Sequence, residues 1–302
     1  MNKKKIAIIE PIGLSAESIH QLKETFKGHE IEIFDSRHYS DDELITSLKD
    51  TNIIALTNRP LNYHIIKNLP CLELIAVAFA GMDHIDSQAV KEKSIIIKNA
   101  SGYANSAVSE LVIGFMIALS RNIVQNNNQM NQNISTNTGS ELKGKTLGIV
   151  GFGNIGKEVA KLASIFGVKI IPFATEHNLD DLKDLFRQSD FISLHIPLTE
   201  QTRGLINKDY LSLMKKSAFL INCARGPIVN QLDLINALEQ KQLKAAAIDV
   251  FDTEPPLASN HPLLNRADII ATPHIGFNTQ EALKEKARIA IYHIKTYLDS
   301  LK

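Results

Sequence analysis

Short apolar runs alternate with amphipathic stretches along the first hundred residues. The runs are nearly continuous in Ile, Val, Leu and Phe, which is typical of parallel strands covered on both faces. The expected strands are Lys5–Ile9, Ile31–Phe34, Ile53–Leu56, Leu72–Phe79 and Ile95–Lys98. The expected helices are Ala16–Lys27, Asp42–Leu48 and Tyr63–Asn68, with Ser15 and Ser40 as N-caps of the first two. This alternation predicts a doubly wound α/β sheet.

A long apolar helix, Ser106–Arg121, and a polar Asn- and Gln-rich segment, Gln125–Ser140, divide the chain. We expect the polar segment to be an exposed connection or a flexible loop. The alternation restarts after Gly144, with expected strands at Thr146–Val150, Val168–Phe173, Phe191–Leu194, Ala218–Asn222, Ala245–Val250 and Ile269–Ala271. The last helix, Gln280–Leu298, is expected to pack back on the first domain. The chain would then cross between two domains near Asn99–Gly102 and Gly276–Asn278.

Composition narrows the function classes. Lys plus Arg and Asp plus Glu both number 33, which gives no reason to expect a nucleic acid or an anionic membrane as partner. The two cysteines lack metal-ligand spacing, so we expect free thiols and no metal site. The longest apolar stretch, Val108–Leu119, is too short to span a bilayer. These features predict a cytoplasmic globular protein.

The strongest local motif is Gly151-Phe152-Gly153-Asn154-Ile155-Gly156, which follows one expected strand and opens an expected helix. Glycines in this setting let the backbone approach a pyrophosphate, which the helix N-terminus then stabilises. A glycine-rich turn without a ligand is the alternative.

The residue that would select the cofactor is missing from its usual place. An acid at the end of the next strand would bind the adenosine ribose and favour NAD, but Ala174 stands there. Glu176 could serve from a shifted position, whereas Thr175 and His177 would suit the 2′-phosphate of NADP. We expect NAD, with NADP as the alternative.

Reduction of a 2-keto acid needs a cation for the carboxylate and a general acid for the developing alkoxide. Arg225 follows an expected strand, and its planar guanidinium suits a carboxylate. His274 follows the last strand, and Glu254 would favour its protonated form. Asp249 is placed for the nicotinamide ribose or carboxamide. A surface Arg, an ordinary loop His and a capping Asp are the alternatives.

Together these residues resemble the D-isomer-specific 2-hydroxyacid dehydrogenase family, and the resemblance covers nearly the whole chain. The matching stretches are Ala80-Gly81-Met82-Asp83-His84-Ile85-Asp86, Asn99-Ala100-Ser101-Gly102-Tyr103, Val108-Ser109-Glu110, the Gly151 loop, Leu194-His195-Ile196-Pro197-Leu198-Thr199, the Arg225 segment, Asp249 to Pro255, and Thr272-Pro273-His274-Ile275-Gly276.

The resemblance implies two Rossmann-like domains. A dinucleotide-binding domain, residues 101–277, would be inserted into a flavodoxin-like substrate-binding domain, residues 1–100 plus 278–302. The implied assembly is a homodimer.

The resemblance also implies site residues. Arg225, Glu254 and His274 would be catalytic, and Ala80 and Gly81 would bind the substrate carboxylate from across the cleft. The expected cofactor contacts are Gly151, Gly153, Asn154, Ile155, Gly156, Thr175, Pro197, Thr202, Cys223, Ala224, Asp249 and Gly276. Cys223 replaces a small residue beside Arg225, so thiol reagents are expected to inhibit.

The predicted function is hydride transfer between NAD(P)H and a small 2-keto acid to give the D-2-hydroxy acid. The alternative is a dinucleotide-sensing binding protein or corepressor on the same fold; a formate or phosphite dehydrogenase is a more remote one. Phosphoglycerate, glycerate or hydroxypyruvate, glyoxylate and branched acids all remain open as substrates. Arg59 would pair with a substrate phosphate or second carboxylate, or would be a solvated surface residue.

Overall fold

The structure is a computed structural model that describes residues 3–14, 16–130, 137–174, 178–253 and 256–302. It comprises two compact units. Unit 1 contains Met1–Ala104 and Thr279–Lys302, and unit 2 contains Asn105–Asn278. Unit 1 extends past residue 100 because the Ala100 amide donates to the carbonyls of Val77 (2.9 Å) and Phe79 (3.0 Å). The Tyr103 ring also packs on Phe79, with centroids 6.0 Å apart.

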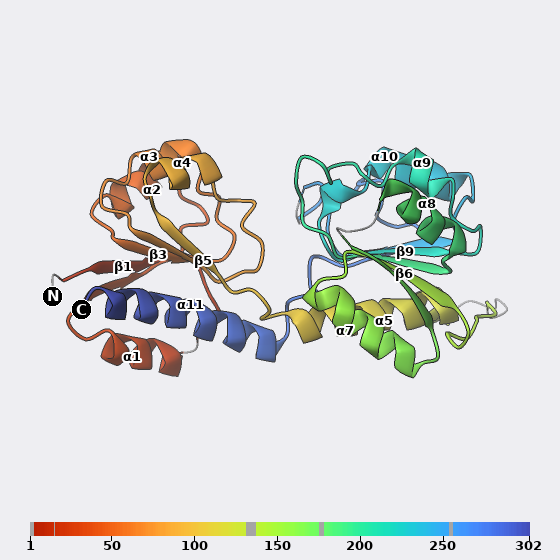
Figure 1. Cartoon of the computed structure of the whole chain (residues 1–302), viewed down its shortest axis with the longest axis horizontal. Helices are drawn as coiled ribbons and strands as arrows, with labels where there is room; N and C mark the ends of the chain where they lie inside the picture. The colour runs from red at the N-terminus through yellow and green to blue at the C-terminus, as the bar shows by residue number, and fades with distance from the viewer. Residues whose placement is uncertain (1–2, 15, 131–136, 175–177, 254–255) are drawn as a thin grey trace. The chain divides into compact units, whose positions relative to one another are not determined.

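Unit 1 is built on one parallel sheet of five strands in the order β2-β1-β3-β4-β5, the flavodoxin-like order. The strands are β1 (Lys5–Ile8), β2 (Glu30–Ile33), β3 (Ile53–Leu56), β4 (Leu74–Val77) and β5 (Ile96–Asn99). The helices are α1 (Ala16–Thr25), α2 (Asp41–Leu48), α3 (Tyr63–Lys67), α4 (Ser87–Glu92) and α11 (Gln280–Ser300). Helices α1 and α11 cover one face of the sheet, and α2, α3 and α4 cover the other (Figure 1).

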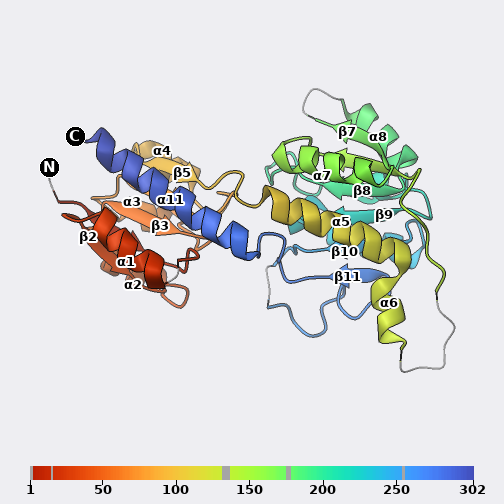
Figure 2. The same ribbon diagram turned by 90° about the horizontal axis from the view of Figure 1, so that it is seen from below.

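The last helix completes the core of unit 1. Ala290, Ile294 and Leu298 of α11 are buried with Leu22 and Phe26 near α1, against the apolar side chains of β1, β3 and β4. Figure 2, seen from below, shows α11 lying beside α1 in front of the strands. The sequentially distant C-terminal segment is therefore an integral part of this sheet's apolar layer.

Local signals explain where the helices of unit 1 begin. Ser40 forms the predicted N-cap of α2 as a full capping box, because its hydroxyl accepts from the Glu43 amide and the Glu43 carboxylate accepts from the Ser40 amide. Ser15 lies outside the described residues. Helix α4 was not predicted, since it has six residues and starts from the N-cap Asp86. The predicted strand Leu72–Phe79 is shortened to β4.

Unit 2 contains a parallel sheet of six strands in the order β11-β10-β9-β8-β6-β7. The strands are β6 (Thr146–Val150), β7 (Lys169–Phe173), β8 (Phe191–Leu194), β9 (Phe219–Asn222), β10 (Ala245–Ile248) and β11 (Ile269–Ala271). The chain order reverses between β6 and β8, which is the position where open α/β sheets bind ligands, beyond the strands' carboxyl ends.

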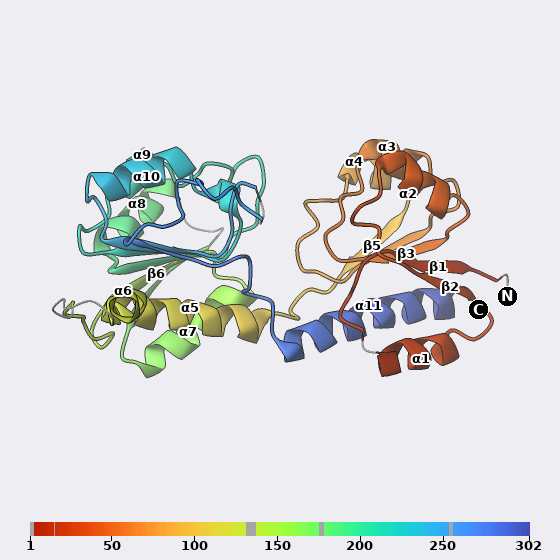
Figure 3. The same cartoon turned by 180° about the vertical axis from the view of Figure 1, so that it is seen from behind.

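Helices cover both faces of the unit 2 sheet. They are α5 (Asn105–Arg121), α6 (Ile123–Asn128), α7 (Asn154–Ile165), α8 (Leu179–Gln188), α9 (Lys208–Leu211) and α10 (Gln231–Glu239), with a 3-10 turn at Gly226–Ile228. Within unit 2, α5 and α7 lie together on one face and α8, α9 and α10 on the other (Figure 3). Helix α6 corrects the prediction of an irregular Gln125–Ser140 segment, because the helical hydrogen bonds continue to Asn128.

No helix among the described residues combines the length and the apolar character that a bilayer crossing requires.

Candidate active site

The glycine motif forms a sharp turn between β6 and α7. Gly151 has φ +101°, and a Cβ there would lie 2.6 Å from the carbonyl carbon of His195. Glycine at this position therefore lets the loops after two neighbouring strands pack together. Gly153 is the N-cap of α7 and offers no side chain to the first turn. Gly153 and Asn154 are exposed. An exposed helix N-terminus whose amides lack a side-chain cap fits a pyrophosphate.

The end of β7 lies next to this turn, since the Gly151 amide donates to the Phe173 carbonyl at 2.9 Å. Ala174 is thus at the expected ribose position, and it carries no carboxylate. Thr175, Glu176 and His177 lie outside the described residues.

The loop after β8 is closed by its own hydroxyl groups. The Thr202 hydroxyl donates to the Pro197 carbonyl at 2.7 Å and accepts from the Thr199 amide at 2.8 Å. Ser193 is fully buried, and its hydroxyl lies 2.8 Å from Nε2 of His195. Burial lowers the pKa of His195 to about 4, so this ring is neutral at physiological pH.

Arg225 is presented by a turn that Asn222 organises. Asn222, buried at the end of β9, accepts from the Ala224 amide (3.0 Å) and donates to the Arg225 carbonyl (3.0 Å). A Cβ on Gly226 would overlap the carbonyl group of Phe251, so glycine is required for the turn to approach the loop after β10. Arg225 itself is half-buried, and its guanidinium donates to the Ala224 carbonyl at 2.8 Å.

Cys223 and Ala224 of this turn are half-buried. Burial of the thiol, together with the negative charge of Asp249, raises the pKa of Cys223 well above its ordinary value. The thiolate that alkylating reagents attack is therefore disfavoured. This finding argues against the expected inhibition by thiol reagents.

His274 has φ +55°, a left-handed conformation that is uncommon for a residue with a side chain. Its amide donates to the carbonyls of Asp249 (2.8 Å) and Thr272 (3.0 Å). Its ring meets that of Phe277 edge to face, with centroids 5.5 Å apart. Glu254, the predicted partner of this histidine, lies outside the described residues.

Asp249 holds the His274 turn. It is 1% exposed, and its carboxylate accepts from the Thr272 hydroxyl (2.6 Å), the Ile275 amide (2.8 Å) and the Gly276 amide (2.8 Å). Burial raises the pKa of Asp249 despite these three hydrogen bonds. Both carboxylate oxygens are thus engaged by the loop after β11.

These groups share one edge of unit 2, because they follow the carboxyl ends of parallel strands in one sheet. Among the described residues, no group of three or more His, Cys, Asp or Glu is arranged to hold a metal ion. The edge combines a glycine turn that opens a helix, a guanidinium and an imidazole, which are groups that nicotinamide-dependent reduction of a keto acid uses.

Known proteins share this architecture. Residues 113–276 match the family described as "D-isomer specific 2-hydroxyacid dehydrogenase, NAD binding domain". The chain is 36% identical over 309 residues to the D-3-phosphoglycerate dehydrogenase of Methanocaldococcus jannaschii, with 97% of this chain and 57% of the relative aligned. It is 37% identical over 294 residues to the hydroxypyruvate reductase of Thermotoga maritima, with 93% and 94% aligned.

A solved structure agrees with these matches. The NAD⁺-bound 3-phosphoglycerate dehydrogenase of Entamoeba histolytica superposes with a TM-score of 0.84 at 26% identity, and the alignment covers 100% of this chain and 97% of that chain. The chain belongs to the D-isomer-specific 2-hydroxyacid dehydrogenase family. The predicted family, fold class, oxidoreductase class and nicotinamide cofactor are thereby confirmed. The chain spans just over half of the Methanocaldococcus relative and nearly all of the Thermotoga one.

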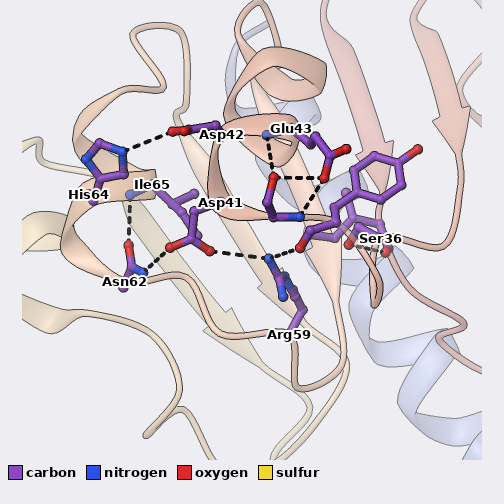
Figure 4. A network of polar contacts seen from close by, with 11 residues as sticks. Ser36, Asp41, Asp42, Glu43, Arg59, Asn62, His64 and Ile65 are labelled. Carbon is purple, nitrogen blue, oxygen red and sulfur yellow. Dashed lines mark hydrogen bonds and ion pairs between the residues drawn. The ribbon is translucent and has the colours of Figure 1, made fainter.

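In unit 1 of this dehydrogenase, the expected substrate residues also lie in loops that follow the ends of strands. Ala80 is exposed and Gly81 half-buried, and the Ala80 carbonyl accepts from the Asn99 side chain at 2.6 Å. The surroundings of Arg59 test one of its two sequence interpretations, that of a solvated surface residue. Its side chain is 15% exposed, and its guanidinium donates to the Tyr39 carbonyl (2.9 Å) and lies 3.4 Å from the Asp41 carboxylate (Figure 4). Arg59 is therefore not a solvated surface residue.

The sequence analysis assigned no role to three residues that support the site of this dehydrogenase. Asn222 shapes the Arg225 turn, Thr272 binds Asp249, and Ser193 binds His195. Each is a polar residue in or directly after an apolar strand, and that placement was the available signal, because buried polar groups need partners.

Proposed function

We propose that this dehydrogenase reduces a small 2-keto acid to the D-2-hydroxy acid with a nicotinamide cofactor. The observation that carries the proposal is the placement of Arg225 after β9 and His274 after β11, on either side of β10 in the same sheet. The matched relatives are named as dehydrogenases and reductases, which favours the enzyme over a dinucleotide-sensing protein or corepressor.

The proposed roles follow from the chemistry of each group. The bound nicotinamide supplies the hydride. Arg225 binds the substrate carboxylate and the keto oxygen, so that negative charge developing on that oxygen is stabilised. His274 donates the proton that the oxygen takes up, and Glu254 is proposed as the partner of its imidazole. Asp249 fixes the backbone turn that presents His274.

For the cofactor, we propose NAD, with NADP as the alternative that Ala174 leaves open. The proposed contacts are those expected from the sequence: Gly151, Gly153, Asn154, Ile155 and Gly156 around the pyrophosphate, Thr175 at the ribose, and Pro197, Thr202, Cys223, Ala224, Asp249 and Gly276 toward the nicotinamide. The exposed, glycine-capped start of α7 supports this assignment. The Thr202 hydroxyl is used within its own loop, so we assign that residue a backbone or shape contribution.

We further propose the division of labour that the sequence suggested. Residues 101–277 would bind the dinucleotide, while residues 1–100 plus 278–302 would bind the substrate, with Ala80 and Gly81 at its carboxylate. A cytoplasmic homodimer that needs no nucleic acid, membrane or metal is the proposed setting.

The function is tested by following oxidation of NADH and NADPH with glyoxylate, hydroxypyruvate, 3-phosphohydroxypyruvate and branched 2-keto acids. We expect turnover with at least one acid and a preference for NADH. The variants Arg225→Ala and His274→Asn should each lower kcat/KM by about 100-fold or more, which corresponds to about 3 kcal/mol. Asparagine is chosen at 274 because it tolerates the left-handed backbone.

Arg187→Gln is the matched control, because it removes a guanidinium that is exposed on α8 and pairs with Asp184 one helical turn away. Wild-type turnover in Arg225→Ala or His274→Asn would contradict the proposal. Cofactor binding without turnover of any acid would favour the sensing protein.

A further inference from the structure

The guanidinium of Arg59 is held by the start of α2. One of its terminal nitrogens, 2.9 Å from the Tyr39 carbonyl, also lies 3.4 Å from a carboxylate oxygen of Asp41. The other oxygen of Asp41 accepts from the Asn62 side chain at 2.7 Å, and Asn62 caps α3. Figure 4 shows Asp41 between Arg59 and Asn62. The arginine is thus part of a polar network within unit 1 that engages one terminal nitrogen, while its buried Nε has no hydrogen-bond partner among the described residues.

The backbone at Arg59 is fixed as firmly as its side chain. One oxygen of Glu10 accepts from three successive amides, those of Thr57 (2.8 Å), Asn58 (2.9 Å) and Arg59 (2.8 Å). Glu10 is 4% exposed and follows β1, the strand next to β3. Lys286 of α11 is 3% exposed, and burial lowers its pKa although the nearby charge of Glu10 opposes that shift. A turn of consecutive amides of this kind is a ready anion site, and here a buried carboxylate already fills it.

This rigid loop adjoins the loop that holds Ala80 and Gly81. The Leu61 amide donates to the His84 carbonyl at 3.0 Å, and the Asp86 amide donates to the Leu61 carbonyl at 2.9 Å. Both loops follow neighbouring parallel strands, β3 and β4. Arg59 therefore stands beside the proposed substrate loop, while its charged end is turned to the start of α2.

We propose that Asp41 is a specificity-determining residue, which retains the Arg59 guanidinium so that the enzyme favours 2-keto acids without a second anionic group. This inference rests on the proposed function and adds the substrate class to it. The backbone of Arg59 cannot shift toward a phosphate without breaking the Glu10 contacts. Its side chain cannot turn without leaving the Asp41 carboxylate and the Tyr39 carbonyl. A phosphorylated substrate would have to compete with both.

The test compares hydroxypyruvate with 3-phosphohydroxypyruvate, two acids that differ only in the phosphoryl group. The wild-type enzyme is expected to have the higher kcat/KM for hydroxypyruvate. Asp41→Asn removes the charge that retains Arg59 and should shift the kcat/KM ratio toward the phosphorylated acid by about tenfold. The double variant Asp41→Asn with Arg59→Gln should lose that shift, because the released guanidinium is what would bind the phosphate.

Asp42→Asn is the matched control. Asp42 neighbours Asp41 in the first turn of α2 and carries the same charge near the helix N-terminus, but it pairs with His64 at 3.5 Å. Its substitution should leave the ratio unchanged, so a shift confined to Asp41→Asn cannot come from helix electrostatics. The melting temperature of each variant checks its folding.

The single variant Arg59→Gln gives a second measurement that does not require removal of Asp41. If Asp41 retains Arg59, the ratio of kcat/KM for the two substrates should stay within about twofold of the wild-type ratio. A selective loss of activity on the phosphorylated acid would show that Arg59 already contacts the phosphate, and would overturn the proposal. A wild-type preference for the phosphorylated acid would overturn it as well. Absence of turnover with these two acids and also with glyoxylate and branched 2-keto acids would instead refute the proposed function, and the inference with it.

Discussion

Replacement of Asp249 by Asn separates the two roles proposed for this residue, which are to fix the turn that presents His274 and to contact the nicotinamide. The carboxylate binds the amides of Ile275 and Gly276 through different oxygens. The asparagine amide can accept only one of those two hydrogen bonds, and it places an NH₂ group against the other N–H. The turn that holds His274 at φ +55° then loses one of its hydrogen bonds to residue 249.

The magnitude follows from the bonds lost. A hydrogen bond to a charged group contributes about 1.5–3 kcal/mol, and a left-handed residue with a side chain costs about 1–2 kcal/mol. We expect kcat to fall by about 30- to 160-fold, which corresponds to about 2–3 kcal/mol. The free energy of unfolding should change by only about 1 kcal/mol, because the substitution also removes a buried charge whose pKa burial has raised.

Steady-state kinetics with hydroxypyruvate and calorimetric titration with NADH separate the two roles. A positioning role predicts a lower kcat with an NADH Kd within about twofold of the wild-type value. Thr272→Val removes one donor to the same carboxylate, at 2.6 Å, and should reproduce a smaller part of the kcat loss. An unchanged kcat together with weaker NADH binding would refute the positioning role and indicate that Asp249 contacts the nicotinamide.

Two further predictions concern His195 and Cys223, partly buried titratable residues that directly follow strands of the unit 2 sheet. The folded-state pKa of His195 is about 4, below the ordinary 6.5, so the unfolded chain binds more protons between these values. The associated stability is complete above pH 6.5 and is lost as the pH falls toward 4, by about 3 kcal/mol. Urea unfolding should show this loss in the wild type beyond that of His195→Gln, and identical pH dependences would contradict it. In Cys71→Ser, which lacks the exposed thiol, iodoacetamide at pH 7.5 should label Cys223 only after unfolding. Rapid labelling of the native variant, detected by mass spectrometry, would show that burial does not protect this thiol.

The sequence was a good guide to elements whose burial is uniform. The fully buried parallel strands β3 and β8 were predicted with their observed bounds, because a short continuous apolar run between polar segments is typical of such a strand. Short helices such as α4 and α6 were missed or taken for loops. Their stability comes from caps and tertiary contacts more than from an apolar period.

The site was predictable as a set of strand-end residues, but the partners of each side chain were not. Arg225 and His274 follow β9 and β11, as the motifs indicated. Asp249 was expected to face the nicotinamide, and Arg59 either a substrate anion or solvent. The structure shows both side chains in hydrogen bonds with neighbouring loops. A motif specifies where a residue stands along the chain. The partner of its side chain depends on loops that are distant in sequence, and no local pattern records them.

The two units use the same device to fix their functional edges. Glu10 follows β1 and binds the loop after its neighbour β3, and Asp249 follows β10 and binds the loop after its neighbour β11. Each acid is almost fully buried and accepts successive backbone amides. Burying a carboxylate costs desolvation energy, which its hydrogen bonds must offset. Here the same hydrogen bonds also fix the loop that carries Arg59 in one unit and the loop that carries His274 in the other. An acid at the end of a buried parallel strand should therefore be weighed as an organiser of the adjacent loop before it is assigned to a ligand.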